Sequence, residues 1–207
     1  LGKVYVTKMY DLPEGRRATK GKYIANFLPL AEDETITSVL ALPKGFKEVD
    51  GALMMVTQDG TIKKTDIAAF ANVRSNGLIA INLKDDNKLV DARLVHEGDT
   101  VLLASYKGQA IRFQEDDIRA MGRTASGVKG MKLGKDDYVV SMSVIPEDWA
   151  NTSLLILGEE GYGKKTDVAD FKIQGRGGAG VKAMKVTDKT GPIVGAALVG
   201  ADYQEVI

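Results

Sequence analysis

The sequence predicts an all-β, propeller-like array of about four repeated blades, each containing about four short strands. The first observation is composition, because 23 glycines and only 5 prolines in 207 residues favour many tight turns. The second is that the runs LMMVTQDG, VLLASYKG and LLILGEEG superpose when the chain is aligned on Gly60, Gly108 and Gly161. The third is that other residue types recur at fixed distances after these glycines, with a period of roughly fifty residues.

In chain order, each repeat opens with the apolar run before its first glycine, which predicts a buried strand entering a turn. Gly2 holds the corresponding place in an earlier repeat, and the strand before it is absent from the sequence. Leu155 and Met184 are expected in the core. Ten residues after each first glycine an apolar residue is expected to anchor that core: Leu12, Phe70, Ile118 and Phe171.

A second glycine follows in each repeat, at Gly21, Gly77, Gly127 and Gly180. Positions four and six after it are apolar, whereas position five is Asn or Lys, which predicts a strand with one wet face. An acidic turn and a further apolar strand complete the repeat. We therefore expect one partial domain with blades at residues 1–42 (incomplete), 51–95, 99–144 and 152–199, and with 202–207 as the first strand of a further blade.

Composition restricts the function classes. The absence of cysteine excludes disulfides and thiolate metal sites and favours a cytosolic origin. The single histidine, His96, argues against a histidine metal centre or a catalytic triad. No apolar run is long enough to span a membrane, and the chain opens without a signal peptide. The chain is expected to be a segment of a longer protein.

Two glycine-rich stretches resemble nucleotide-binding loops. Residues Gly175 to Gly180 fit the dinucleotide pattern G-x-G-x-x-G, but the residues that follow alternate with period two instead of predicting a helix. Residues Gly158 to Lys164 have the glycine spacing of a P-loop, but Lys165 stands where a Ser or Thr would hold magnesium. Both stretches are therefore predicted to be turns between strands.

Charge is balanced overall, with 28 basic and 28 acidic residues, but the cations recur at equivalent places in the repeats. In a radial array such positions would form an arc of positive charge. Each cation is expected to be solvated in the free protein, so Lys64→Ala should leave thermal stability nearly unchanged. The candidate DNA-binding residues are Arg17, Lys20, Lys63, Lys64, Arg74, Arg112, Arg123, Lys129, Lys164, Lys165, Arg176 and Lys182.

An arc of cations suits double-stranded DNA, which carries one charge per ~1.7 Å of helix axis. Such contacts read no base sequence. Duplex fits better than single strands, because the aromatic residues Phe27, Phe70 and Phe171 are assigned to the core instead of to stacking platforms. The alternative is a propeller that binds other proteins and has no nucleic-acid role. In that case the charged residues are merely solvated.

No residue pattern predicts a catalytic site, a metal site or a bound cofactor. Asp116-Asp117 and Asp136-Asp137 are adjacent pairs in predicted turns, where solvated carboxylates are expected. His96 and Trp149 fall between repeats, where a packing role is expected.

Three long segments together resemble the C-terminal domain of the A subunit of bacterial DNA gyrase: VTQDGTIKKTDIAAFANVRSNGLIAINL, IRAMGRTASGVKGMKL and GYGKKTDVADFKIQGRGGAGVKAMKVT. The resemblance covers essentially the whole chain. It implies a β-pinwheel, a disc in which neighbouring blades exchange a strand, with duplex DNA wrapped around a basic perimeter.

The resemblance further implies a bacterial cytoplasmic, nucleoid-associated parent: an ATP-hydrolysing type IIA topoisomerase that introduces negative supercoils. Its partners would be the rest of the gyrase A subunit together with the gyrase B subunit in a heterotetramer. No membrane interaction is expected. ATP and magnesium would act through other domains or subunits, and the family's catalytic tyrosine lies in another domain.

The sequence also departs from the family pattern. The signature Q-R-R-G-G-K-G belongs to a first blade whose beginning is absent here. A degenerate copy, with two of the three signature cations replaced, is formed by Gln174, Gly175, Arg176, Gly177, Gly178, Ala179 and Gly180. The corresponding domain in the A subunit of topoisomerase IV shares the architecture and is the alternative within the class.

Overall fold

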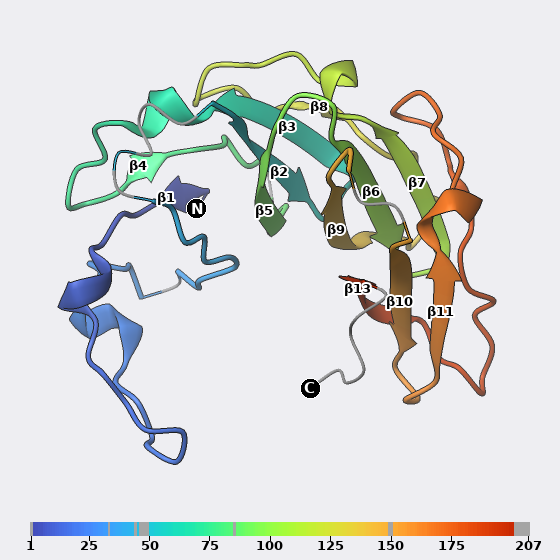
Figure 1. Cartoon of the computed structure of the whole chain (residues 1–207), viewed down its shortest axis with the longest axis horizontal. Coiled ribbons are helices and arrows are strands. Elements are labelled where there is room, and N and C mark those ends of the chain that lie inside the picture. The colour runs from blue at the N-terminus through green and yellow to red at the C-terminus, as the bar shows by residue number, and fades with distance from the viewer. Residues whose placement is uncertain are drawn as a thin grey trace.

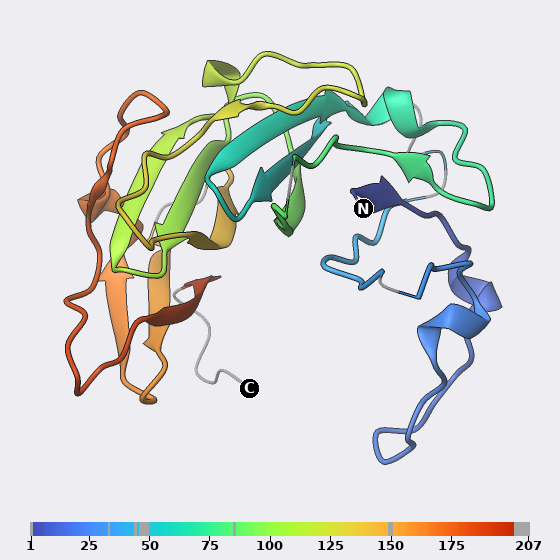
Figure 2. The same cartoon turned by 180° about the vertical axis from the view of Figure 1, so that it is seen from behind.

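The computed structural model describes residues 2–32, 34–43, 45, 50–84, 86–148 and 151–200. Its sheets follow one another along an arc, with the N-terminal segment at one end and the hairpin of residues 153–167 at the other (Figures 1 and 2). Strands and short 3-10 turns make up the regular structure of these residues. The predicted all-β class is therefore confirmed.

The described residues form four sheets; three of them combine strands from adjacent repeats, and the fourth contains strands of one repeat. The first pairs β1 (Lys3–Val4) with β4 (Leu78–Ile79). The second has the order β5 (Leu89–Val95), β2 (Ala52–Thr57), β3 (Thr61–Asp66) and β8 (Val128–Lys129). The third has the order β9 (Val139–Ile145), β6 (Thr100–Ser105), β7 (Gln109–Gln114) and β12 (Val181–Lys182). The fourth has three strands, β13 (Ile193–Val199), β10 (Ser153–Gly158) and β11 (Gly163–Asp167).

Strand exchange between neighbouring blades explains this pairing. The outermost strand of each sheet in the middle of the arc arrives from the following repeat, so that β8 pairs with β3 through Val128 and Ile62, and β12 pairs with β7 through Val181 and Ala110. The strands β5, β9 and β13 lie on the inner side of the arc, and the outer strands lie on its convex side (Figure 1). The exchange implied by the resemblance is thus present.

Short 3-10 turns directly follow β3, β7 and β11, the second strands of their repeats. They are η4 (Ile67–Phe70), η5 (Glu115–Asp117) and η6 (Val168–Asp170), and the first repeat has η1 (Met9–Asp11) and η2 (Ile24–Asn26). The expected anchors Phe70, Ile118 and Phe171 at or just after these turns are buried. Leu12, the anchor expected in the first repeat, is 39% exposed.

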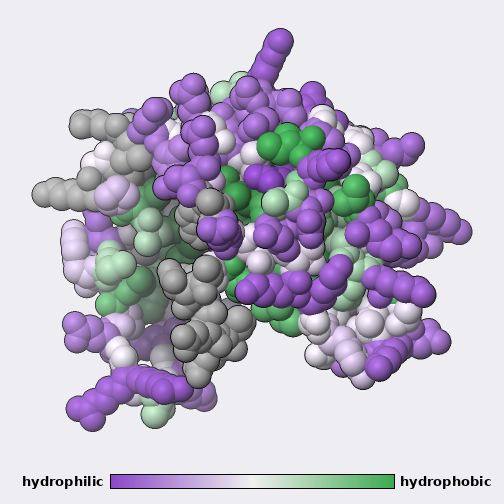
Figure 3. Space-filling view, turned by 45° about the vertical axis from the view of Figure 1, so that its right-hand side comes forward, coloured by the Kyte–Doolittle hydropathy of each residue, from purple (hydrophilic) through white to green (hydrophobic). Residues whose placement is uncertain are grey.

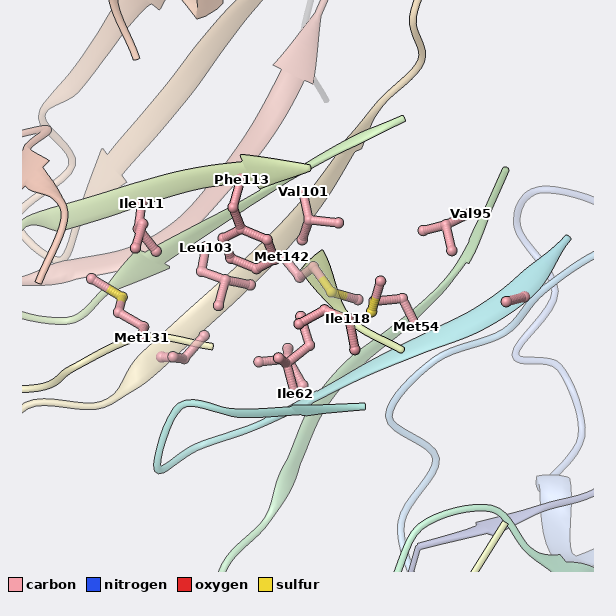
Figure 4. Packing of buried hydrophobic residues seen from close by; sticks show 13 residues of the cluster. Met54, Ile62, Val95, Val101, Leu103, Ile111, Phe113, Ile118, Met131 and Met142 are labelled. Atoms are coloured by element: carbon pink, nitrogen blue, oxygen red, sulfur yellow. The ribbon is translucent and has the colours of Figure 1, made fainter. Parts of the chain in front are cut away.

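The core lies between neighbouring sheets, where side chains from β2 and β3 meet those from β6, β7 and β9 (Figure 4). Each sheet in the middle of the arc therefore buries both of its faces, which accounts for the continuous apolar runs in its strands. Met54 and Ile62 face Leu103 and Phe113 across the first of these interfaces. Apolar burial of this kind is the main stabilising term of the fold.

Two details differ from the sequence expectations. The strand expected at positions four to six after each second glycine is not formed: after Gly77, Gly127 and Gly180 only the two residues directly after the glycine join a ladder, and after Gly21 the chain forms η2. Met184 is buried as expected, but Leu155 is only partly buried, since no further sheet covers its face of β10 within the described residues. Trp149 and residues 202–207 lie outside the described residues.

Candidate nucleic-acid interface

The convex side of the arc is formed by the exchanged strands and the loops that precede them, and we call this surface the outer edge (residues 71–83, 119–133 and 172–186). Lys129 on β8 and Lys182 on β12 are exposed there. Lys132 and Lys185, three residues further along, are exposed as well. The surface toward the viewer in Figure 3 is mostly hydrophilic, with small hydrophobic areas between the polar side chains.

Glycines fix how closely the loops of the outer edge approach the sheets. Gly127 and Gly180 have φ angles of +99° and +73°, which favour glycine. A Cβ atom on Gly127 would lie 2.6 Å from the carbonyl oxygen of Ile62, and one on Gly180 would lie 2.2 Å from that of Ala110. Gly127 and Gly180 therefore allow β8 and β12 to reach the neighbouring sheets, and each glycine sets the position of the lysine two residues later.

The degenerate signature box, residues 174–180, is bound to the preceding blade. Arg176 donates from Nε to the carbonyl oxygen of Asp117 (3.0 Å) and from Nη1 to that of Lys129 (3.1 Å). The amide of Gly177 donates to Gly130 (2.7 Å), and the carbonyl oxygen of Gly178 accepts from the amide of Lys132 (2.8 Å). Arg176 is nevertheless exposed, so the box presents a cation while its backbone is fixed.

Both nucleotide-loop resemblances are turns in the structure. Residues 174–180 lead into the two-residue strand β12 and not into a helix. Residues 158–164 form the β10–β11 turn, in which the amide of Gly158 donates to the carbonyl oxygen of Tyr162 (2.8 Å). The helix that must follow a dinucleotide or phosphate loop is missing at both places, since β12 and β11 follow instead.

Lys63 contradicts the expectation of a solvated, DNA-binding cation. Its side chain is fully buried at 0% exposure, and its Nζ donates to the carbonyl oxygens of Ala80 (2.6 Å) and Arg123. Burial, and then the nearby charge of Arg123, lower the pKa of Lys63 to about 8. The amine joins its own blade to the next one and cannot reach a phosphate, because the exchanged chain covers it.

Lys64 is also held between blades instead of being free in solvent. Its Nζ lies 2.5 Å from a carboxylate oxygen of Glu115 and donates to the Glu115 carbonyl oxygen at 3.2 Å. The side chains of Lys64 and Glu115 are 13% and 9% exposed. The expectation that Lys64 is a solvated cation is therefore wrong, and this contact argues against the predicted unchanged stability of Lys64→Ala.

Arg112 occupies the same repeat position as Lys64 and makes the equivalent bond. Its Nε donates to Oγ1 of Thr100 (2.9 Å), and its Nη1 donates to the carbonyl oxygen of Val168 (3.2 Å), the counterpart of the Glu115 carbonyl. Burial lowers the pKa of this guanidinium. Lys63, Lys64 and Arg112 thus link neighbouring blades, and we call them the interblade cations.

The remaining candidates differ in exposure. Lys164 and Lys165, the repeat equivalents of Lys63 and Lys64, are exposed, and Lys164 donates to Ala183 at 3.3 Å. Arg123 is partly buried. The exposed candidates elsewhere are Arg17, Lys20, Arg74, Lys129, Arg176 and Lys182.

Sequence reasoning missed four exposed cations of the outer edge. Lys132 and Lys185 stand at the wet position of the alternating segment, a signal that the repeat alignment already contained. Arg119 and Lys172 directly follow the anchors Ile118 and Phe171, which places them on the surface beside buried residues.

The acidic residues organise turns. Asp137 accepts from the Ser105 hydroxyl (2.9 Å) and from the amide of Lys107 (2.8 Å), while Asp116 and Asp117 are exposed in η5. His96 is exposed, and its amide donates to Asp99. No group of three potential metal ligands is found among the described residues. In the same part of the chain, no helix is long and apolar enough to cross a lipid bilayer.

An arc of strand-exchanged sheets whose outermost strands carry exposed lysines defines a class, the propeller-like β proteins with a basic outer edge. A family model described as the DNA gyrase C-terminal domain, beta-propeller, matches residues 1–43, 52–96, 99–146 and 152–199. The chain belongs to this family.

Relatives and solved structures agree with the family. The chain is 45% identical to the DNA gyrase A subunit of Deinococcus deserti over 98% of its own length and 25% of the relative, and 42% identical to that of Salmonella typhimurium over 94% and 22%. It therefore spans about a quarter of the length of these relatives.

Two solved domains share the architecture. The C-terminal domain of a DNA topoisomerase IV superposes with a TM-score of 0.83 at 30% identity, covering 96% of this chain and 61% of that one. A DNA gyrase A C-terminal domain superposes with a TM-score of 0.79 at 29% identity, covering 97% and 64%.

Proposed function

We propose that this chain binds and wraps duplex DNA around its outer edge without sequence preference, as the C-terminal domain of a DNA gyrase A subunit. The observation that carries the proposal is that exposed lysines recur at equivalent positions of adjacent blades: Lys129 with Lys182 on the outermost strands, and Lys132 with Lys185 three residues after them. Evenly placed cations along a convex edge gain affinity by releasing counterions from a bent duplex. The blades at 1–42, 51–95, 99–144 and 152–199 are the units of this edge, with 202–207 opening a further blade.

In the whole protein, wrapping would support ATP-dependent negative supercoiling by a type IIA topoisomerase. The partners would be the rest of the gyrase A subunit together with the gyrase B subunit, which would supply the ATP and magnesium chemistry. A bacterial cytoplasmic, nucleoid-associated location follows from this role.

Duplex affinity at several salt concentrations tests the proposal. The chain should bind a long duplex better than one that meets a single blade, because wrapping adds contacts along the arc. Replacing both Lys129 and Lys182 with Ala should reduce the slope of log K against log salt by about two. Lys135→Ala, an exposed lysine beside Asp136 and Asp137, is the charge-matched control and should leave the slope unchanged. Binding without length or salt dependence would favour an interaction propeller.

The runner-up is the C-terminal domain of a topoisomerase IV A subunit, which the superposition on such a domain supports. Ligation of a nicked DNA circle bound to the chain, followed by measurement of its linking number, separates the gyrase and topoisomerase IV proposals. Gyrase-type wrapping predicts a positive linking-number shift, whereas an unchanged linking number with retained binding would favour topoisomerase IV.

A further inference from the structure

A cleft lined by residues of η4 and β4 lies at the outer edge. Its volume is about 660 Å³, and it is lined by parts of residues 68–79, by Lys3 from the first repeat and by Arg123 from the next blade. Three of the lining residues are cations, Lys3, Arg74 and Arg123, and none is Asp or Glu. The cleft thus combines positive charge from three repeats with room for a ligand.

Comparison with the other blades shows why this cleft has no carboxylate. The 3-10 turn of η4 reads IAAF, whereas η5 reads EDD and η6 reads VAD. The ninth position after the first glycine is Ala69 in this repeat, but it is Asp117 and Asp170 in the next two. Ala69 is exposed, and its small side chain leaves the cleft open. The absence of negative charge is therefore particular to this blade among the three compared.

Lys63 supports the cleft from inside the blade. Its buried Nζ donates to the backbone oxygens of Arg123 and Ala80, so one wall of the cleft is attached to the sheet beneath it. Lys3 lies 3.7 Å from a carboxylate oxygen of Glu34, which offsets part of its charge, but Glu34 is not a lining residue. The charged side chains that line the cleft are therefore all cationic.

We propose that this cleft holds one backbone phosphate of the bound duplex, with Arg74 and Arg123 as its charged donors. The inference rests on the proposed function and assigns it a defined subsite. Arginine donates two parallel hydrogen bonds to phosphate oxygens. The amides of Asn72 and Asn76, which also line the cleft, are neutral donors for the same oxygens or the adjoining sugar.

Adding a carboxylate tests the subsite without removing any contact. Ala69→Asp introduces the side chain that the repeat carries at Asp117 and Asp170, so the turn is expected to accept it. Ala69→Asp and Arg74→Gln should each lower duplex affinity about tenfold near 0.1 M salt and reduce the salt slope by about one. The charge control Lys135→Gln should do neither. Circular dichroism melting verifies that each variant is folded.

The chain has no cysteine, so a single introduced thiol can locate the DNA. An iron chelate attached to Asn76→Cys should cleave bound duplex, whereas the same reagent on Glu160→Cys, at the exposed β10–β11 turn, should cleave it much less.

Each result has a definite meaning. If the chain binds duplex normally but Ala69→Asp and Arg74→Gln behave like Lys135→Gln, the cleft is not a phosphate site and the general proposal survives. If the unmodified chain does not bind duplex at any salt concentration, the proposed function fails, and the subsite fails with it.

Discussion

The third and fourth sheets are built from similar sequence patterns, but they are buried differently. All six residues of β6 are buried, whereas β10 alternates between buried and more exposed positions. Leu102 and Leu155 occupy the same repeat position, yet Leu102 packs against the next sheet with 0% exposure and Leu155 is only partly buried. The burial of a strand in this array is therefore set by its neighbour as much as by its own sequence.

The same contrast extends to charged residues. Lys63 is buried under the following blade, while its equivalent Lys164 is exposed. Lys64 contacts Glu115 of the following blade, while Lys165 is exposed. A cation at one repeat position thus changes from a surface group to an internal link when another blade packs against it.

The largest expected difference in stability is between alanine variants of the equivalent residues Leu102 and Leu155. Leu102→Ala should reduce the free energy of unfolding by about 2 to 5 kcal/mol, because it leaves a cavity between two sheets. Leu155→Ala should cost about 1 kcal/mol or less, because its side chain has fewer neighbours to lose. Urea denaturation measures both values. Equal losses would mean that the two sheets are covered alike.

The second largest difference in stability is expected between Lys63→Ala and Lys164→Ala. Lys63→Ala should destabilise the chain by about 2 kcal/mol, since two buried carbonyl oxygens lose their donor and the packing of the lysine stem is lost. Lys164→Ala should change stability by less than about 0.5 kcal/mol. Thermal and urea unfolding of the two variants provide the comparison, and similar behaviour would contradict the buried interblade position of Lys63.

A somewhat smaller difference is expected for Lys64 and Lys165. Lys64→Gln should cost about 1 to 2 kcal/mol, because the Glu115 carboxylate remains in a mostly buried place without its cation. Lys165→Gln should leave stability nearly unchanged. Adding Glu115→Gln to Lys64→Gln should restore part of the loss, and a double-mutant cycle with no coupling would rule out the ion pair.

The pH dependence of stability tests the burial of Lys63 independently of the substitutions above. The pKa of Lys63 is about 8 in the folded chain and near its ordinary value of 10.5 when unfolded. Between these values the unfolded chain binds one more proton, so stability should rise with pH in that window. Urea unfolding across it should show a steeper rise for the unmodified chain than for Lys63→Met. Parallel profiles would contradict the lowered pKa.

The sequence was sufficient for the class of fold, because apolar runs and glycines recur in register. Phe70, Ile118 and Phe171 could be assigned to the core from the repeat alone. The partial burial of Leu155 could not be predicted from the sequence, because it depends on a neighbouring sheet and not on the local pattern.

For the candidate interface, the exposed lysines Lys129 and Lys182 agree in location with the predicted arc, although their contact with DNA is still a proposal. The positions of Lys63, Lys64 and Arg112 could not be derived. Their partners are mainly backbone oxygens brought close by strand exchange, and a repeat alignment records side-chain types but not such oxygens.

Strand exchange also has a mechanical consequence. β8 is covalently part of the blade that contains β6 and β7, but its ladder partner is β3 of the preceding blade. A force that pulls on Lys129 is therefore divided between two blades, one loaded through the covalent backbone and the other through the ladder. The next exchanged strand, β12, repeats the arrangement one blade further on. Tension applied along the convex side is therefore distributed over consecutive blades and does not act on a single blade alone.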